Sequence, residues 1–255
     1  MIIMKPIREN NGAIAGHSNV RRKASAFTLI ELLVVIAIMA ILASLILSAL
    51  GPARYSAQKT QARIEMKAIE TAIQAYHSAY NRYPTPTNVI TADFTFGQPG
   101  LGSVTNGYAN NNSDLMIILL DEPILCNTNH RSNPQQTPFL NVAKRATSTN
   151  SPGLGPDFTY RDPWGNPYII TIDYDYDDLC KDNFYSLPSV SNKNDPNDKD
   201  GGYNGLRTYD NKLTYALKGP IMIWSMAGPG NKGTNNPNVA ANQDPNNRHL
   251  LNWVR

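Results

Sequence analysis

The chain has 255 residues, enough for one sizeable domain with an appendage, and a formal net charge of +3. Of its 23 Lys and Arg, five precede residue 27 together with one acid, so this segment carries +4. The other 18 basic and 19 acidic side chains leave the rest of the chain at −1. A near-neutral body lacks the clustered basic footprint that nucleic-acid binding needs, so a nucleic-acid partner is not expected.

Residues 27–50 form an apolar run whose only polar side chains are Thr28, Glu31, Ser44 and Ser48. As a helix, these 24 residues would cross a hydrocarbon core of about 30 Å. A cleaved secretory signal explains the run poorly, because the small residues at 24–26 precede the apolar stretch instead of following it. A plain membrane anchor leaves Glu31 unexplained, since an acid inside a membrane costs about 2.5–3.5 kcal/mol and usually has a function.

The stretch AFTLIELLVVIAIMAIL begins at Ala26, after a cluster of three basic residues at 21–23. It resembles the N-terminal motif of the type IV pilin superfamily, which includes the pseudopilins of type II secretion systems. The resemblance implies that a prepilin peptidase removes residues 1–26 as a leader, cutting between Ala26 and Phe27, and that Phe27 is then N-methylated. The family usually has Gly before the cut bond, and Ala26 is a small residue that should also fit there.

The same resemblance supplies a role for Glu31. Cleavage would expose an α-amino group at Phe27, which is positively charged near neutral pH. A carboxylate in apolar surroundings is tolerated when it is paired. In the family, this acid of one subunit meets the N-terminal amine of its neighbour. Glu31 is therefore expected to set the axial register of an assembled filament, as a docking group rather than a catalyst.

The pattern after the apolar run predicts that the helix continues to Tyr80. Gly51 and Pro52 are expected to loosen or kink the junction, because proline removes a helix hydrogen bond. Beyond them, one apolar stripe recurs at spacings of three and four residues: Ala62, Met66, Ile69, Ile73, Tyr76 and Tyr80. A coiled-coil dimer could use this stripe, but the pattern ends at NRYPTP within three heptads. Packing against a sheet of the same chain is therefore favoured.

Residues 81–255 have the composition of a loop-rich body with a small sheet. Ser113 is expected to cap a short helix in SDLMIILLDEP. After the turn residues DPWGNP, positions 168–176 alternate in a way that predicts a strand with one face in water. Two further strands are predicted in RTYDNKLTYAL and GPIMIWSMAG. A sheet of so few strands needs a helix to cover it, and the amphipathic half of the long helix can do so.

The expected fold class is therefore α+β and pilin-like. A long N-terminal helix, with a membrane half and an amphipathic half, packs on a small antiparallel β-sheet with long loops. The expected division is a leader at 1–26, the helix at 27–80, and a periplasmic globular domain at 81–255. Trp164 and Trp253 are interpreted as structural residues that fill the core.

Three segments of the body narrow the resemblance: NRYP after the helix, DPWGNPY before a strand, and IWSMAGPGNKG with LLNW near the end. In this order they are similar to the G-type major pseudopilins of type II secretion systems. Those proteins often bind calcium in the loop after the last strand. Here the only acid of that loop is Asp244, with Asn231 as a helper, whereas calcium takes six to eight oxygen ligands and usually several carboxylates. Another acidic loop, with Asp195, Asp198 and Asp200, is interpreted as a solvated turn.

The two cysteines, Cys126 and Cys180, show no metal-binding spacing. Outside the cytoplasm they could form a disulfide; two free buried thiols are the alternative. No GxSxG, HExxH, GxxxxGK[ST] or GxGxxG motif occurs, and the four histidines are scattered. The chain is therefore not expected to be an enzyme, and no catalytic residue is assigned.

The expected function is that of a structural subunit of a type II secretion pseudopilus. Its expected partners are other copies of itself, a prepilin peptidase, the inner-membrane secretion platform and minor pseudopilins. Its expected location is the bacterial inner membrane, crossed once with the body in the periplasm, and then the filament. The alternatives are a type IV pilus subunit for adhesion, motility or DNA uptake, and a membrane-tethered binding or enzymatic domain.

Overall fold

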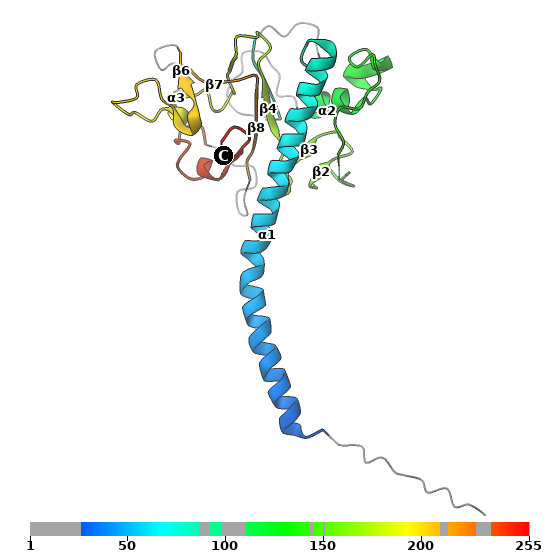
Figure 1. Cartoon of the computed structure of the whole chain (residues 1–255), viewed down its shortest axis with the longest axis vertical. Coiled ribbons are helices and arrows are strands. Elements are labelled where there is room, and N and C mark those ends of the chain that lie inside the picture. Colours follow the sequence, from blue (N-terminus) through cyan, green and yellow to red (C-terminus); the bar gives the residue numbers. More distant parts are fainter. Residues whose placement is uncertain are drawn as a thin grey trace, which may run out of the picture. The chain divides into compact units, whose positions relative to one another are not determined.

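A computed structural model describes residues 27–86, 92–97, 111–142, 145–149, 151–209, 214–227 and 236–254. The chain divides into two compact units, residues 1–49 and 50–255. Helix α1, Leu29–Tyr80, begins in the first unit and ends in the second (Figure 1). Pro52 lies inside this helix without ending it, so the predicted continuation to Tyr80 is confirmed.

The part of α1 in the first unit is exposed at every position from residue 29 to residue 49. Among the described residues, α1 is the one helix that contains a window apolar enough to cross a membrane, and none of that window is buried. A helix that is apolar all round needs an apolar environment on every side. The described residues of this unit supply none.

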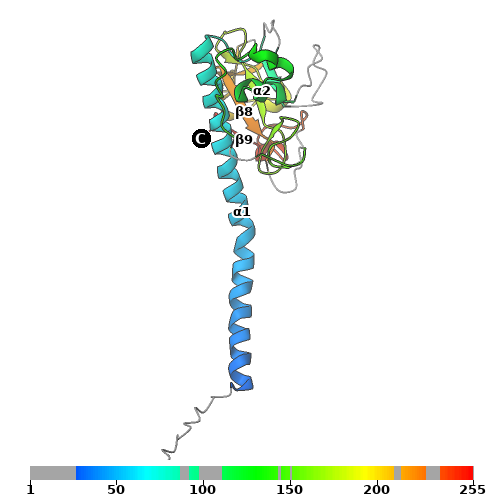
Figure 2. The same ribbon diagram turned by 90° about the vertical axis from the view of Figure 1, so that its right-hand side faces the viewer.

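In the second unit, α1 presents the predicted stripe to the core. Ala62, Met66, Ile69, Ile73 and Tyr76 are all buried, and Tyr80 is half-buried. The stripe covers one face of a four-stranded antiparallel sheet with the order β1-β4-β8-β9. The strands are β1, Phe94–Phe96; β4, Ile169–Ile172; β8, Ile221–Ser225; and β9, Leu250–Leu251. Figure 2 shows α1 beside β8 and β9.

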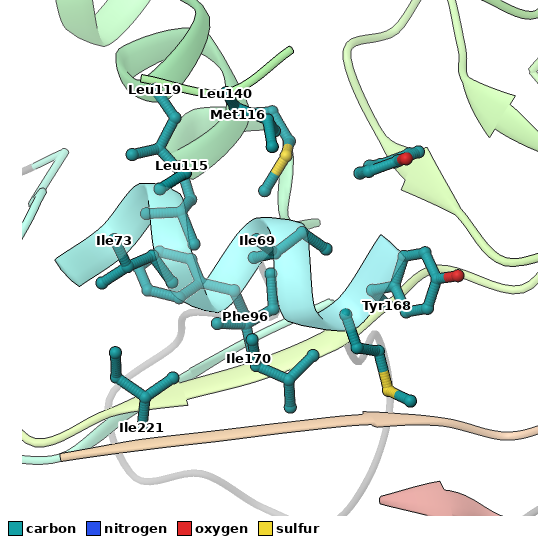
Figure 3. Packing of buried hydrophobic residues seen from close by; sticks show 14 of the residues in the cluster. Ile69, Ile73, Phe96, Leu115, Met116, Leu119, Leu140, Tyr168, Ile170 and Ile221 are labelled. Carbon is teal, nitrogen blue, oxygen red and sulfur yellow. The ribbon is translucent and has the colours of Figure 1, made fainter. Parts of the chain in front are cut away.

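Helix α2, Ser113–Leu120, packs against the same core as the stripe of α1. Figure 3 shows Ile69 and Ile73 of α1 with Leu115 and Leu119 of α2 and with the sheet residue Ile170. The other short elements are η1, Leu125–His130; α3, Pro188–Ser191; η2, Tyr203–Gly205; and η3, Asn246–Arg248. Together, these findings confirm the expected α+β class, with an antiparallel sheet covered by the amphipathic half of a long helix.

The wet face predicted for β4 is not observed. All four residues of the strand are buried, and it ends at Ile172. Ile170 and Ile172 face the α1 core, whereas Ile169 belongs to a second core on the opposite face of the sheet. That second core includes Phe184, Tyr185, Tyr215 and Trp224. Because later segments of the chain cover the sheet, its far face is dry.

Two small antiparallel arrangements complete the body, one beside each core. β5, Leu179–Cys180, β7, Tyr215–Lys218, and β6, Arg207–Thr208, pair in the order β5-β7-β6, so the single strand predicted over 207–217 is in fact two strands. β2, Gly153–Leu154, pairs with β3, Tyr160–Arg161.

The predicted cap of α2 was also wrong. Asn112, and not Ser113, holds the N-cap position, and its side chain makes no capping hydrogen bond. Instead, the Asn112 amide donates to the carbonyls of Tyr160 and Tyr168 and accepts from the Tyr160 N–H. This buried amide therefore ties α2 to the strands.

Candidate functional site

Glu31 lies in the first turn of α1, and its carboxylate is held by Thr28, just before the helix. The backbone N–H and the hydroxyl of Thr28 both donate to Glu31 Oε2, at 2.8 Å each. The N–H of Glu31 in turn donates to Thr28 Oγ1 at 3.3 Å. This reciprocal pair is a capping box, in which two otherwise unpaired donors of a helix start are satisfied. The sequence analysis assigned Glu31 only to assembly and missed this local role.

The surroundings of Glu31 are open in the single chain. Phe27 is 79% exposed, and the apolar side chains that follow it are also exposed. Ala26, the other residue of the expected cleavage site, lies outside the described residues. A carboxylate at the start of an exposed apolar helix is chemically suited to pair with a cation delivered by another molecule in apolar surroundings.

The DPWGNP segment forms the tight turn between β3 and β4, and Asp162 organises it. Its buried carboxylate accepts the N–H groups of Trp164 and Asn166 at 2.9 Å each through Oδ1, and the hydroxyl of Ser225 on β8 through Oδ2. Burial raises the pKa of Asp162, and the Ser225 hydroxyl and the backbone N–H groups oppose this rise. Asp162 therefore has a structural role, because its hydrogen bonds connect the turn to strand β8 of the sheet.

Comparison with known proteins shows similarity in the N-terminal region of the chain, which includes Glu31. Residues 21–47 match the family model described as the prokaryotic N-terminal methylation motif. The chain carries a prepilin-type methylation motif. Over 72 residues, which are 28% of this chain and 50% of the relative, it is 42% identical to the type II secretion system core protein G of Aeromonas hydrophila. The chain thus spans about half the length of this curated relative. No solved structure matches the chain.

The tryptophans of the body lie outside the methylation motif, which ends at residue 47. Trp164 and Trp253 are both half-buried and pack at the edges of the two cores, so they are structural as expected but not central. The indole N–H of Trp253 donates to the carbonyl of Asn204. The fully buried tryptophan is Trp224 on β8, which the sequence analysis did not single out.

The disulfide that the sequence left possible is not formed, and Cys126 and Cys180 are free thiols. Cys126 is half-buried beside the α1 core and donates to the carbonyl of Asp114. Cys180 is buried in the second core and donates to the carbonyl of Thr171. The cysteines belong to cores on opposite faces of the sheet, which explains why they do not pair. Burial raises the pKa of Cys126 to about 12, which disfavours the reactive thiolate form.

The residues named for calcium are not brought together as a site within the described part of the chain. Asp244 forms an ion pair with Arg248, with 2.5 Å between Oδ1 and Nε. Asn231 lies outside the described residues. Calcium binding in this loop therefore stays a prediction. The loop with Asp195, Asp198 and Asp200 is largely exposed, and Asp198 lies 3.7 Å from Arg207.

The structure does gather three other acids, which no sequence pattern had connected. Carboxylate oxygens of Asp93, Asp173 and Asp175 lie within 4.8 Å of one another. The pairing of Phe94 with Ile172 places Asp93, before β1, beside Asp173, after β4. Strand register far along the chain creates this cluster, so no local pattern could predict it. Three carboxylates are oxygen donors of the kind a hard cation takes, although calcium needs at least six ligands.

The acids differ in their surroundings. Asp173 is buried and accepts the N–H groups of Tyr176 and Asp178 at 2.6 and 3.0 Å. Burial and the neighbouring Asp175 raise the pKa of Asp173. Burial, more than the nearby acids, raises the pKa of Asp93 to about 7, although the N–H of Lys181 donates to this carboxylate and opposes the rise. Neighbouring positive charge thus does not fully offset the burial of Asp93 and Asp173 and the mutual repulsion within the cluster.

Replacing Asp93 by asparagine is expected to stabilise the chain at pH 8 and to leave its stability unchanged near pH 4. The folded chain keeps the Asp93 proton up to a pH of about 7, whereas the unfolded chain loses it near 3.8. Because the folded state binds the extra proton, wild-type stability falls as the pH rises through this window. The full shift corresponds to about 4 kcal/mol, and solvent screening of the partly exposed carboxyl reduces the expected gain to about 1–2 kcal/mol.

The measurement is thermal unfolding of both proteins at several pH values with EDTA present. Asp200→Asn, at an exposed acid in another loop, is the matched control and should show no such pH dependence. A gain in stability from Asp93→Asn that is equal at pH 4 and pH 8 would contradict the raised pKa of Asp93.

Proposed function

We propose that the chain is a structural subunit of a type II secretion pseudopilus. In this proposal, prepilin peptidase cuts between Ala26 and Phe27, Phe27 is N-methylated, and the subunits assemble into a periplasmic filament that moves folded proteins outward. The observation that carries the proposal is the methylation motif at residues 21–47, together with an acid in the first turn of a helix that is apolar and exposed from residue 29 to residue 49.

The exposed apolar half of α1 needs an apolar environment both before and after assembly. Before assembly, lipid covers the helix, which crosses the inner membrane once and leaves the body in the periplasm. After assembly, the helices of neighbouring copies replace the lipid. Glu31 then pairs with the charged amine of Phe27 in the next copy, because opposite charges attract strongly in a dry environment.

The partners follow from the same proposal. They are further copies of this chain, prepilin peptidase, the inner-membrane assembly platform and minor pseudopilins, with no nucleic acid. The similarity to a core protein of a secretion system supports a non-enzymatic, structural role.

The proposal is tested in a strain that lacks this protein. Exported proteins should accumulate in the periplasm, surface pili should be unchanged in number, and the wild-type chain should begin with N-methylated Phe27 by mass spectrometry. Normal export together with missing pili would favour a type IV pilus subunit. An intact leader on the mature chain would favour a tethered binding or enzymatic domain.

A further inference from the structure

A groove lies between α1 and the sheet edge where the chain ends. Its volume is about 480 Å³, and its lining includes Arg63, Met66, Lys67, Ile221, Leu251 and Trp253. Met66 and Ile221 are buried and form an apolar floor, whereas Arg63 and Lys67 on α1 are exposed and form a basic rim. Glu70 also reaches the groove, where it binds Lys67 at 2.9 Å and the side chain of Asn252 at 3.2 Å.

The basic rim belongs to a longer basic stretch of α1. Between residues 51 and 70 the helix carries four basic residues, Arg54, Lys59, Arg63 and Lys67, and two acids, Glu65 and Glu70. Glu65 is already engaged, since it accepts the hydroxyl of Tyr168 and the amide of Gln61. This stretch therefore presents a net positive surface beside an apolar groove, a combination that suits an acidic ligand with an apolar tip.

The same chain carries such a ligand elsewhere. Residues 173–178, with the sequence DYDYDD, form an acidic loop directly after β4. Tyr176 is 55% exposed, and its left-handed backbone, with φ of 59°, turns the chain sharply between Asp175 and Asp177. Lys181 pairs with Asp177 at 2.9 Å.

The groove and the acidic loop lie at different levels along α1. The groove lies beside residues 63–70, whereas the Tyr176 ring contacts His77 and stacks on Tyr83, at 5.3 Å between the centroids of Tyr176 and Tyr83. His77 lies seven to fourteen residues further along the helix, which corresponds to about 10–20 Å. Complementary surfaces at different places on one molecule join copies head to tail, and a contact of this kind extends into a filament when it does not close.

We propose that the acidic loop 173–178 of one copy docks in the groove of the next copy. Tyr176 lies over the apolar floor, and Asp175 faces the basic rim at Arg63. The inference rests on the proposed function, because it assigns the contact between the bodies of neighbouring subunits within the filament.

The test is chemical cross-linking of the full-length chain in cells that assemble filaments. Copies that carry both Arg63→Cys and Asp175→Cys are treated with a short bis-maleimide. Because each copy has both halves of the contact, the expected product is a ladder of covalent multimers. Either substitution alone should give no ladder, because each copy then has a new cysteine on only one side of the contact, and Cys180 is buried. Arg63→Cys with Asp200→Cys is the matched control, because Asp200 is an exposed acid outside the loop.

Charge exchange gives an independent readout that does not depend on cysteine chemistry. Arg63→Asp alone or Asp175→Arg alone should reduce the assembled fraction about tenfold, because each places like charges together. The two substitutions combined should restore assembly, whereas Asp200→Arg should have no effect.

The outcomes separate this inference from the proposed function. Normal filaments without a ladder, or an equally strong ladder from the Asp200 control, would overturn the docking inference and leave the pseudopilus proposal standing. Wild-type cells without processed Phe27 or filaments would overturn the pseudopilus proposal itself.

Discussion

Replacing Glu31 by glutamine is expected to abolish filament assembly while membrane insertion stays intact. Glutamine also completes a capping box, so its side-chain oxygen keeps the hydrogen bonds from Thr28 and the start of α1 is preserved. What it cannot supply is a negative charge for the amine of Phe27 in a neighbouring copy. Removing one member of a buried ion pair leaves an uncompensated charge and costs about 3–5 kcal/mol per contact.

Glutamine is the sharper substitution because the structure gives Glu31 two separable roles. Glu31→Ala removes both the cap and the charge, so its failure to assemble would not distinguish them. Membrane fractionation, filament counts and the mass of the mature N-terminus are measured for both variants. Normal filaments from Glu31→Gln with defective filaments from Glu31→Ala would show that capping, and not pairing with an amine, is the function of this acid.

The features that the sequence predicted correctly are those decided within a few turns of helix. The stripe from Ala62 to Tyr76 becomes the buried face of α1 because a helix repeats every 3.6 residues whatever it packs against. The FTLIE motif likewise places Thr28 and Glu31 within one turn, so the acid could be recognised without the fold.

The features that could not be predicted from the sequence depend on pairing between strands that lie many residues apart in the chain. The alternation at 168–176 was interpreted as one wet face, but Ile169 is covered by a second core. That core is built from segments, such as those containing Phe184 and Trp224, that no local pattern links to β4. The acid cluster at Asp93 and the groove beside β9 arise in the same way, since pairing between strands positions both.

Replacing Asp162 by alanine is expected to cause the largest loss of stability in the body. Three buried donors, on Trp164, Asn166 and Ser225, would lose the acceptor that joins the turn to β8. Breaking a buried network of this kind costs about 3–5 kcal/mol, which lowers the Tm by about 10 °C in a body of this size. Asp162→Asn should cost only about 1 kcal/mol, because its side-chain oxygen still accepts the two N–H groups and the Ser225 hydroxyl can rotate to accept from the amide.

Thermal unfolding of the full chain in detergent, followed by tryptophan fluorescence, measures both changes, since Trp164 lies in the turn itself. Equal losses from Asp162→Asn and Asp162→Ala would show that the charge, and not the set of hydrogen bonds, holds the turn to β8. The same assay also separates the two ways in which assembly can fail. Asp162→Ala removes filaments by unfolding the body, whereas Glu31→Gln removes them with the Tm of the body unchanged, because its effect lies only in the contact between copies.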